Sequence, residues 1–142
     1  MDTTISLPKP IEILPHRPPF LFLDEVLSCE GNRLEASFDF REELDFFKGH
    51  FPQYAVVPGV ILIEAMAQAV AYWALLKNPN HLVLLTHVDE CKISSSVRPN
   101  QCVKYTIYIE REKLGLVIAQ CKALLGEQEI ATAKIKGFLK AI

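Results

Sequence analysis

A nearly uninterrupted apolar stretch at residues 60–76 constrains the fold of this chain more than any other feature of the sequence. Alanine, leucine and methionine, which are strong helix formers, make up much of it. Pro58 stands just before the stretch, and Asn78-Pro79-Asn80 follows it, which is typical of the start and the end of a helix. We therefore predict one long helix over Gly59–Lys77.

This helix is apolar on nearly every side, so it must be surrounded by lipid or by protein. A membrane span needs about 20 residues with few or no charges, whereas this stretch contains Glu64 and Gln68. We therefore expect a core helix and no membrane span. One small sheet cannot cover all of its circumference, so we also expect a homodimer to complete the burial.

The rest of the chain reads mainly as strands separated by turn residues. Residues 34–40 alternate between apolar and polar side chains, as in a half-buried strand. Residues 41–58 show no clean period and are predicted to form a loop. Five prolines between residues 7 and 19 exclude a long helix there and leave room for a single turn at residues 11–14. The expected strands are residues 20–29, 34–40, 82–88, 93–97, 103–109, 115–125 and 130–139.

Two strands, one long helix and four or five further strands predict an α+β architecture. An antiparallel sheet wrapped around one long central helix lets each element hide its apolar face on the other. The chain has 142 residues, which fits a single domain covering residues 1–142.

Charge and cysteine content narrow the functional classes. A net charge of −2 gives no sign of nucleic acid binding. The four cysteines have neither C-x-x-C nor zinc-finger spacing, so we expect buried free thiols in a reducing compartment. Residues 1–10 lack the basic and apolar regions of a signal peptide. We therefore expect a cytoplasmic protein.

Glu64 is the first candidate for chemistry, because it is a carboxyl group within the apolar helix. Gln68 follows four residues later and shares its helix face. Burial would favour the neutral acid, which is the form that a general acid needs. The alternative is a structural carboxyl group that is hydrogen-bonded to Gln68 or to the backbone.

His50 and Gly59 are the other candidates. His50 lies between Gly49 and Phe51-Pro52, in the loop that leads into the helix, and an imidazole close to a helix N-terminus is held neutral and usable as a base. The alternative is an ordinary loop histidine. Gly59, at the helix start, could let a ligand approach free N–H groups, which would polarise a carbonyl oxygen.

Two separated motifs resemble one enzyme family in sequence and in spacing. They are Gly49-His50-Phe51-Pro52, followed by residues 57–68 with the sequence VPGVILIEAMAQ, and residues 14–21 with the sequence LPHRPPFL. Both are similar to motifs of the 3-hydroxyacyl-[acyl-carrier-protein] dehydratases of bacterial type II fatty acid synthesis, FabZ type. The resemblance runs from about residue 11 to the C-terminus.

The resemblance implies a hot-dog fold and a homodimer with two composite active sites. His50 of one chain would take the C2 proton of a 3-hydroxyacyl thioester, and Glu64 of the other would protonate the departing hydroxyl. Gly59, Val60 and Gln68 would form the substrate-binding part of the site, with the Gly59 N–H on the carbonyl oxygen and Gln68 orienting Glu64. No metal or other cofactor would take part. Glu64 and Val60 stand where the isomerising relative has Asp and Cys, which favours dehydration alone.

The substrate would arrive on the phosphopantetheine of an acyl carrier protein. Lys92 and Arg98 are candidates for docking this acidic carrier, although residues 91–94 are less basic than is usual in the family. Residues 53–55 and the turn at 99–101 also depart from the family pattern. These differences fit aryl polyene, polyketide or unusual lipid synthesis as well as fatty acid synthesis. Dimers could assemble further into a trimer of dimers.

Two other functions are compatible with the same sequence. A hot-dog thioesterase would hydrolyse the thioester with a carboxylate and a water, and would not need His50 and Glu64 together. A non-catalytic acyl-binding subunit would gain little from a buried carboxyl group.

Overall fold

The structure is a computed structural model that describes residues 6–142. Residues 1–5 lie outside the described residues, so the expectation that residues 1–10 are not a signal peptide falls partly outside them. The elements in chain order are α1 (Pro10–Ile13), β1 (Glu25–Glu30), β2 (Arg33–Phe40), α2 (Phe46–Gly49), α3 (Gly59–Lys77), β3 (His81–Ile93), β4 (Gln101–Lys113), β5 (Leu116–Leu125) and β6 (Gln128–Ala141).

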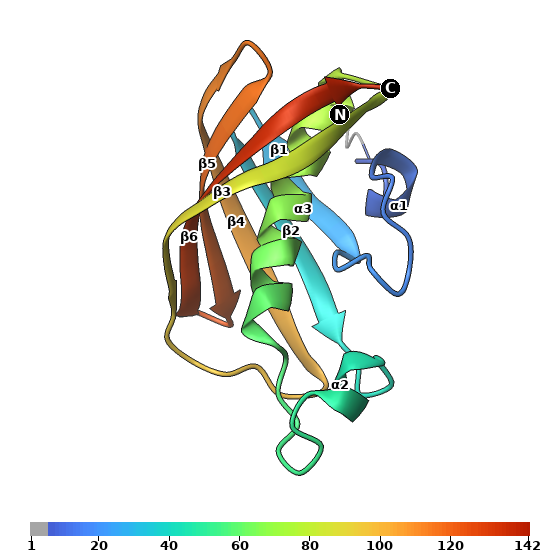
Figure 1. Cartoon of the computed structure of the whole chain (residues 1–142), viewed down its shortest axis with the longest axis vertical. Helices are drawn as coiled ribbons and strands as arrows, with labels where there is room; N and C mark the ends of the chain where they lie inside the picture. The colour runs from blue at the N-terminus through green and yellow to red at the C-terminus, as the bar shows by residue number, and fades with distance from the viewer. Residues whose placement is uncertain (1–5) are drawn as a thin grey trace, which may run out of the picture.

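The strands form one antiparallel sheet in the order β1-β2-β4-β5-β6-β3. β1 and β2, β4 and β5, and β5 and β6 are hairpins. β3 follows α3 and pairs with β6, so β3 and β1 form the two edges of the sheet. Figure 1 shows the sheet curving around α3, which runs along its inner face, while α1 and α2 lie to one side. The α+β fold with one central helix is therefore confirmed.

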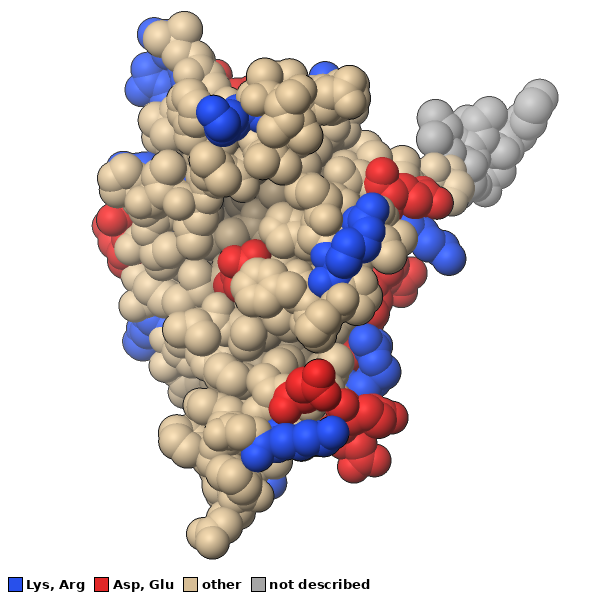
Figure 2. Space-filling view, turned by 45° about the vertical axis from the view of Figure 1, so that its right-hand side comes forward, with Lys and Arg blue, Asp and Glu red and all other residues tan. Residues whose placement is uncertain are grey.

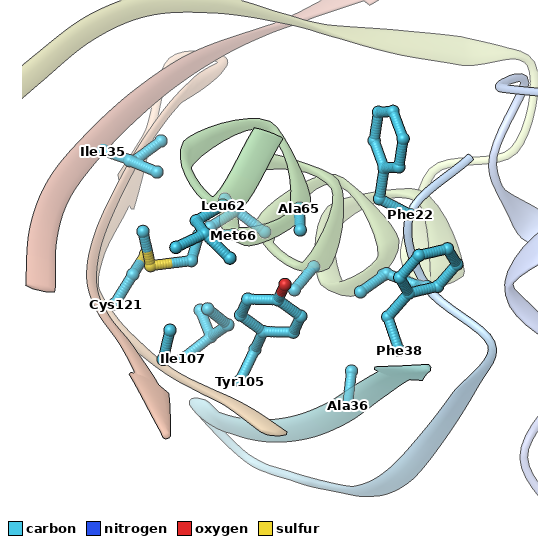
Figure 3. Close-up of a cluster of buried hydrophobic side chains, with 14 of the residues drawn as sticks. Phe22, Ala36, Phe38, Leu62, Ala65, Met66, Tyr105, Ile107, Cys121 and Ile135 are labelled. Atoms are coloured by element: carbon cyan, nitrogen blue, oxygen red, sulfur yellow. The ribbon is translucent and has the colours of Figure 1, made fainter. Parts of the chain in front are cut away.

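The core lies between α3 and the inner face of the sheet. In Figure 3, Leu62 and Met66 of α3 point toward Ile107 and Cys121 of the sheet. By length and composition α3 could cross a membrane, but 61% of its most apolar window is buried inside the protein, as in a core helix. The alternation expected in β2 is confirmed, since its inward side chains are buried: Leu34, Ala36, Phe38 and Phe40.

Three expectations about local structure were wrong. Residues 20–24 are not part of β1, which begins at Glu25. β3 extends through the polar residues 89–92 to Ile93, and residues 94–97 form no strand. The segment 41–58, expected to be a loop throughout, contains the short helix α2. A single turn near residues 11–14 is present as α1.

The four cysteines are free thiols, but they are not all buried. Cys121 is buried, Cys29 is half-buried, and Cys91 and Cys102 are exposed. Burial raises the pKa of the Cys121 thiol to about 12, so this group stays protonated.

Two core tyrosines provide a matched test of this packing. The Tyr105 hydroxyl is buried without a hydrogen-bond partner among residues 6–142, whereas the Tyr72 hydroxyl donates to the Pro8 carbonyl at 2.7 Å. Tyr105→Phe removes an unpaired polar atom and should raise the free energy of unfolding by about 1 kcal/mol. Tyr72→Phe loses a hydrogen bond and should lower it by about 1 kcal/mol. Urea denaturation measures both, and a destabilised Tyr105→Phe protein would contradict the expectation.

Candidate active site

Glu64 and Gln68 lie on one face of α3 and form the centre of the site. The Gln68 amide nitrogen donates to Glu64 Oε2 at 3.0 Å and to the Phe20 carbonyl at 3.1 Å. The Gln68 amide oxygen accepts the Phe22 N–H at 2.8 Å. With only 1% of Gln68 exposed, these bonds fix the orientation of its amide, and the amide in turn orients the carboxyl group.

His16 approaches the same carboxyl oxygen from the segment that precedes β1. Its Nε2 lies 3.6 Å from Glu64 Oε2, and the two side chains are 23% and 22% exposed. His16 belongs to the motif at residues 14–21, which by itself gives this residue no separate role. Membership of that motif is the signal that the sequence carries for His16, because a contact between residues 48 positions apart leaves no periodic pattern.

A pocket of about 150 Å³ opens in front of Glu64 between α3, β3 and β6. His16, Glu64 and Gln68 supply its polar groups. Figure 2 shows a face of the molecule on which uncharged residues predominate, with acidic atoms beside a hollow near its middle. The other lining residues are small or apolar: Ala67, Ala71, Val83, Leu84, Leu85, Ile135 and Gly137. Such a pocket suits an apolar ligand with one reactive polar end.

His50 directly follows α2 and is half-buried. Its Nδ1 lies 3.1 Å from the Val56 carbonyl oxygen. A carbonyl oxygen only accepts, so in the neutral form of the ring Nδ1 carries the proton and Nε2 has the lone pair of a base. The His50 ring packs on Phe51, with ring centroids 4.1 Å apart. Within one chain His50 does not line the pocket that contains Glu64.

Gly59 is the first residue of α3, where backbone N–H groups have no partner within the helix. A Cβ atom at Gly59 would lie 2.7 Å from Ile93 Cδ1, so the end of the Ile93 side chain lies directly against the helix start. The neighbouring Val60 side chain is 69% exposed, which is unusual for an apolar residue of a core helix.

The remaining candidates lie on the surface. Lys92 and Arg98 are exposed, and the Arg98 guanidinium stacks over the Tyr54 ring at 4.7 Å. Arg98 therefore contacts the loop that joins His50 to α3. No group of three or more His, Cys, Asp or Glu side chains within residues 6–142 is arranged to hold a metal ion.

Comparison with solved structures confirms the hot-dog fold. The dehydratase heterocomplex ApeI:P from Xenorhabdus doucetiae contains a chain with a TM-score of 0.83 at 15% identity, covering 94% of this chain and 91% of that one. A mutant of the thioesterase SAV0944 from Staphylococcus aureus has a TM-score of 0.66 at 14% identity, covering 82% and 92%. Because both identities are low, these similarities show the fold alone.

Comparison of sequences identifies the family. Residues 14–134 match the model of the FabA-like domain. The 3-hydroxyacyl-[acyl-carrier-protein] dehydratase FabZ of Bacillus cytotoxicus is 40% identical over 127 residues, covering 87% of this chain and 88% of the relative. The FabZ of Macrococcus caseolyticus is 34% identical over 138 residues, covering 95% of both. The chain thus belongs to the FabA-like hot-dog proteins and, within them, to the family of FabZ-type 3-hydroxyacyl-[acyl-carrier-protein] dehydratases.

Proposed function

We propose that this protein removes water from 3-hydroxyacyl thioesters carried on acyl carrier protein and releases trans-2-enoyl thioesters. The observation that carries the proposal is the orientation of the Glu64 carboxyl by the buried Gln68 amide at the mouth of an apolar pocket. Membership of the FabZ-type family supports the substrate class.

His50 and Glu64 divide the proton transfers between them. His50 Nε2 takes the C2 proton, because its Nδ1 is already occupied by the hydrogen bond to Val56. The electron pair of the broken C–H bond forms the C2–C3 double bond, and the C3–O bond breaks as Glu64 protonates the hydroxyl, which departs as water. The Gly59 N–H stabilises the negative charge that builds on the thioester oxygen.

A second copy of the chain supplies the other half of each site. β3 is an edge strand of 13 residues, and its exposed side chains include Leu84, Leu85 and Val88. An unpaired edge with apolar side chains favours pairing with another chain. On α3, the half-exposed or exposed residues Val60, Ile63, Glu64 and Ala67 form a stripe that this partner would cover. The partner's His50 would then complete the site at Glu64.

Carrier docking would use exposed cations near the loop that joins His50 to α3. Arg98 lies over Tyr54 in the loop that joins His50 to α3, so an acidic carrier bound there would deliver its phosphopantetheine arm close to His50 and, in the dimer, to the partner's pocket. Lys92, exposed at the end of β3, would add to the same attraction.

The central test measures hydration of a trans-2-enoyl thioester by loss of enoyl absorbance. We expect His50→Ala and Glu64→Gln each to lower the rate by about 100-fold or more, because each removes one proton transfer. Unchanged rates in both variants would reject the proposed function, and release of free thiol from the wild-type reaction would identify a thioesterase instead.

A mixing experiment tests whether the two residues come from different chains. His50→Ala and Glu64→Gln subunits, unfolded and refolded together in equal amounts, should recover about a quarter of wild-type activity, because half of the dimers are mixed and each mixed dimer has one intact site. Each variant refolded alone should stay inactive. No recovery in the mixture, with mixed dimers verified by mass spectrometry, would contradict a shared site.

Reversal of charge at Arg98 tests the docking surface. Arg98→Glu should raise KM for the carrier-bound substrate by about tenfold or more, since it places like charges together, while KM for a pantetheine thioester should not change. Arg33→Glu, which alters an exposed arginine of the β1–β2 hairpin, is the charge-matched control. Equal effects of the two variants would argue against docking at Arg98.

A further inference from the structure

His16 is held in place as firmly as the residues with proposed chemical roles. Arg17 Nη1 donates to the Leu14 carbonyl at 2.9 Å and to the His16 carbonyl at 2.7 Å, which fixes the backbone on both sides of the ring. The same segment continues to Phe20 and Phe22, whose backbone groups bind Gln68. His16 and Gln68 are therefore held by the same segment, and both contact Glu64.

The surroundings of His16 determine its charge and its tautomer. Its Nδ1 is buried without a hydrogen-bond partner among residues 6–142, so a proton there would be an unpaired buried donor. Burial lowers the pKa of His16 below 6.5, Glu64 opposes this shift, and Arg17 adds to it. The pocket residues of β3 and β6 that face this region are uncharged. The ring is thus neutral at pH 7, with its proton on Nε2.

Two N–H donors then converge on a single oxygen of Glu64. Gln68 donates to Oε2 at 3.0 Å, and His16 Nε2 lies 3.6 Å from the same atom. This second distance is slightly longer than a hydrogen bond, and contacts of this kind in active sites shorten when substrate is bound. Because an oxygen that accepts one N–H group and faces a second is a poor place for a proton, the acidic proton of Glu64 belongs on Oε1.

We propose that His16 is a positioning residue for the dehydration: its neutral ring, together with Gln68, keeps Oε2 of Glu64 as an acceptor, so that Oε1 carries the proton delivered to the substrate hydroxyl. This inference rests on the proposed function of Glu64. It adds a residue from the segment before β1 to a site otherwise built from α3 and the His50 loop.

Three variants test the role of His16 in enoyl hydration. His16→Leu removes the donor and should lower kcat about 10- to 100-fold, the scale expected when a reacting group loses its alignment, with KM changed by no more than about twofold. His16→Gln returns an N–H donor and should recover most of kcat. His81→Gln, which alters a histidine beyond the carboxyl end of α3, should match the wild type.

Added to Glu64→Gln, His16→Leu should cause no further loss, because His16 acts through Glu64. Long-range proton–nitrogen NMR of the wild type at pH 7 should show the His16 proton on Nε2, a measurement that does not depend on the folding of any variant. Full activity of His16→Leu, equal losses in the Leu and Gln variants, additive losses in the double variant, or a proton on Nδ1 would each overturn the inference. An inactive wild type, or activity unaffected by His50→Ala and Glu64→Gln, would instead reject the proposed function.

Discussion

The buried amide of Gln68 is the interaction on which the arrangement of the site depends. One side chain joins the segment before β1, through Phe20 and Phe22, to the carboxyl group of Glu64 on α3. A buried amide must find partners for its N–H and C=O groups, and three of its bonding positions are used here. The hydrogen bonds that satisfy the buried Gln68 amide therefore also orient the reactive carboxyl group. A substitution at Gln68 would change core packing and chemistry together.

The burial of α3 is uneven: its C-terminal part is mostly buried, whereas its N-terminal part has an outward side that includes Glu64. From Gln68 to Leu75 every residue is buried beneath the sheet, whereas Val60, Ile63, Glu64 and Ala67 face outward to different degrees. The outward stripe lies where the chain also leaves β3 as an unpaired edge. A helix that is apolar on all sides needs more cover than one sheet provides. The outward stripe of α3 therefore favours a second subunit, and because Glu64 belongs to this stripe, the carboxyl group would lie at the boundary between the two subunits.

The sequence predicted the regular elements well where periodicity or helix propensity was strong, as for α3 and β2. It failed where polar residues belong to an edge strand: Asp89 and Glu90 suggested a break, but one face of β3 is in solvent, and a register shift between Asp89 and Lys92 accommodates Glu90 at a φ of 49°. The apolar residues before Glu25 suggested a strand, yet the backbone groups of Phe20 and Phe22 bond to Gln68. Local patterns cannot reveal that a backbone group is satisfied by a side chain 46 residues away.

The same limit applies to the site. Glu64 and Gln68 could be paired from their spacing on a helix, because four residues make one turn. The contact of His16 with Glu64 could not be inferred in this way, since it depends on how the segment before β1 crosses the helix. The fold does not settle the chemistry either, because a thioesterase and a dehydratase complex share it with this chain. What separates these functions is the state of a few atoms: a carboxyl group with one oxygen fixed by donors and the other directed at the substrate is suited to deliver a proton, whereas a carboxylate free at both oxygens is suited to activate a water.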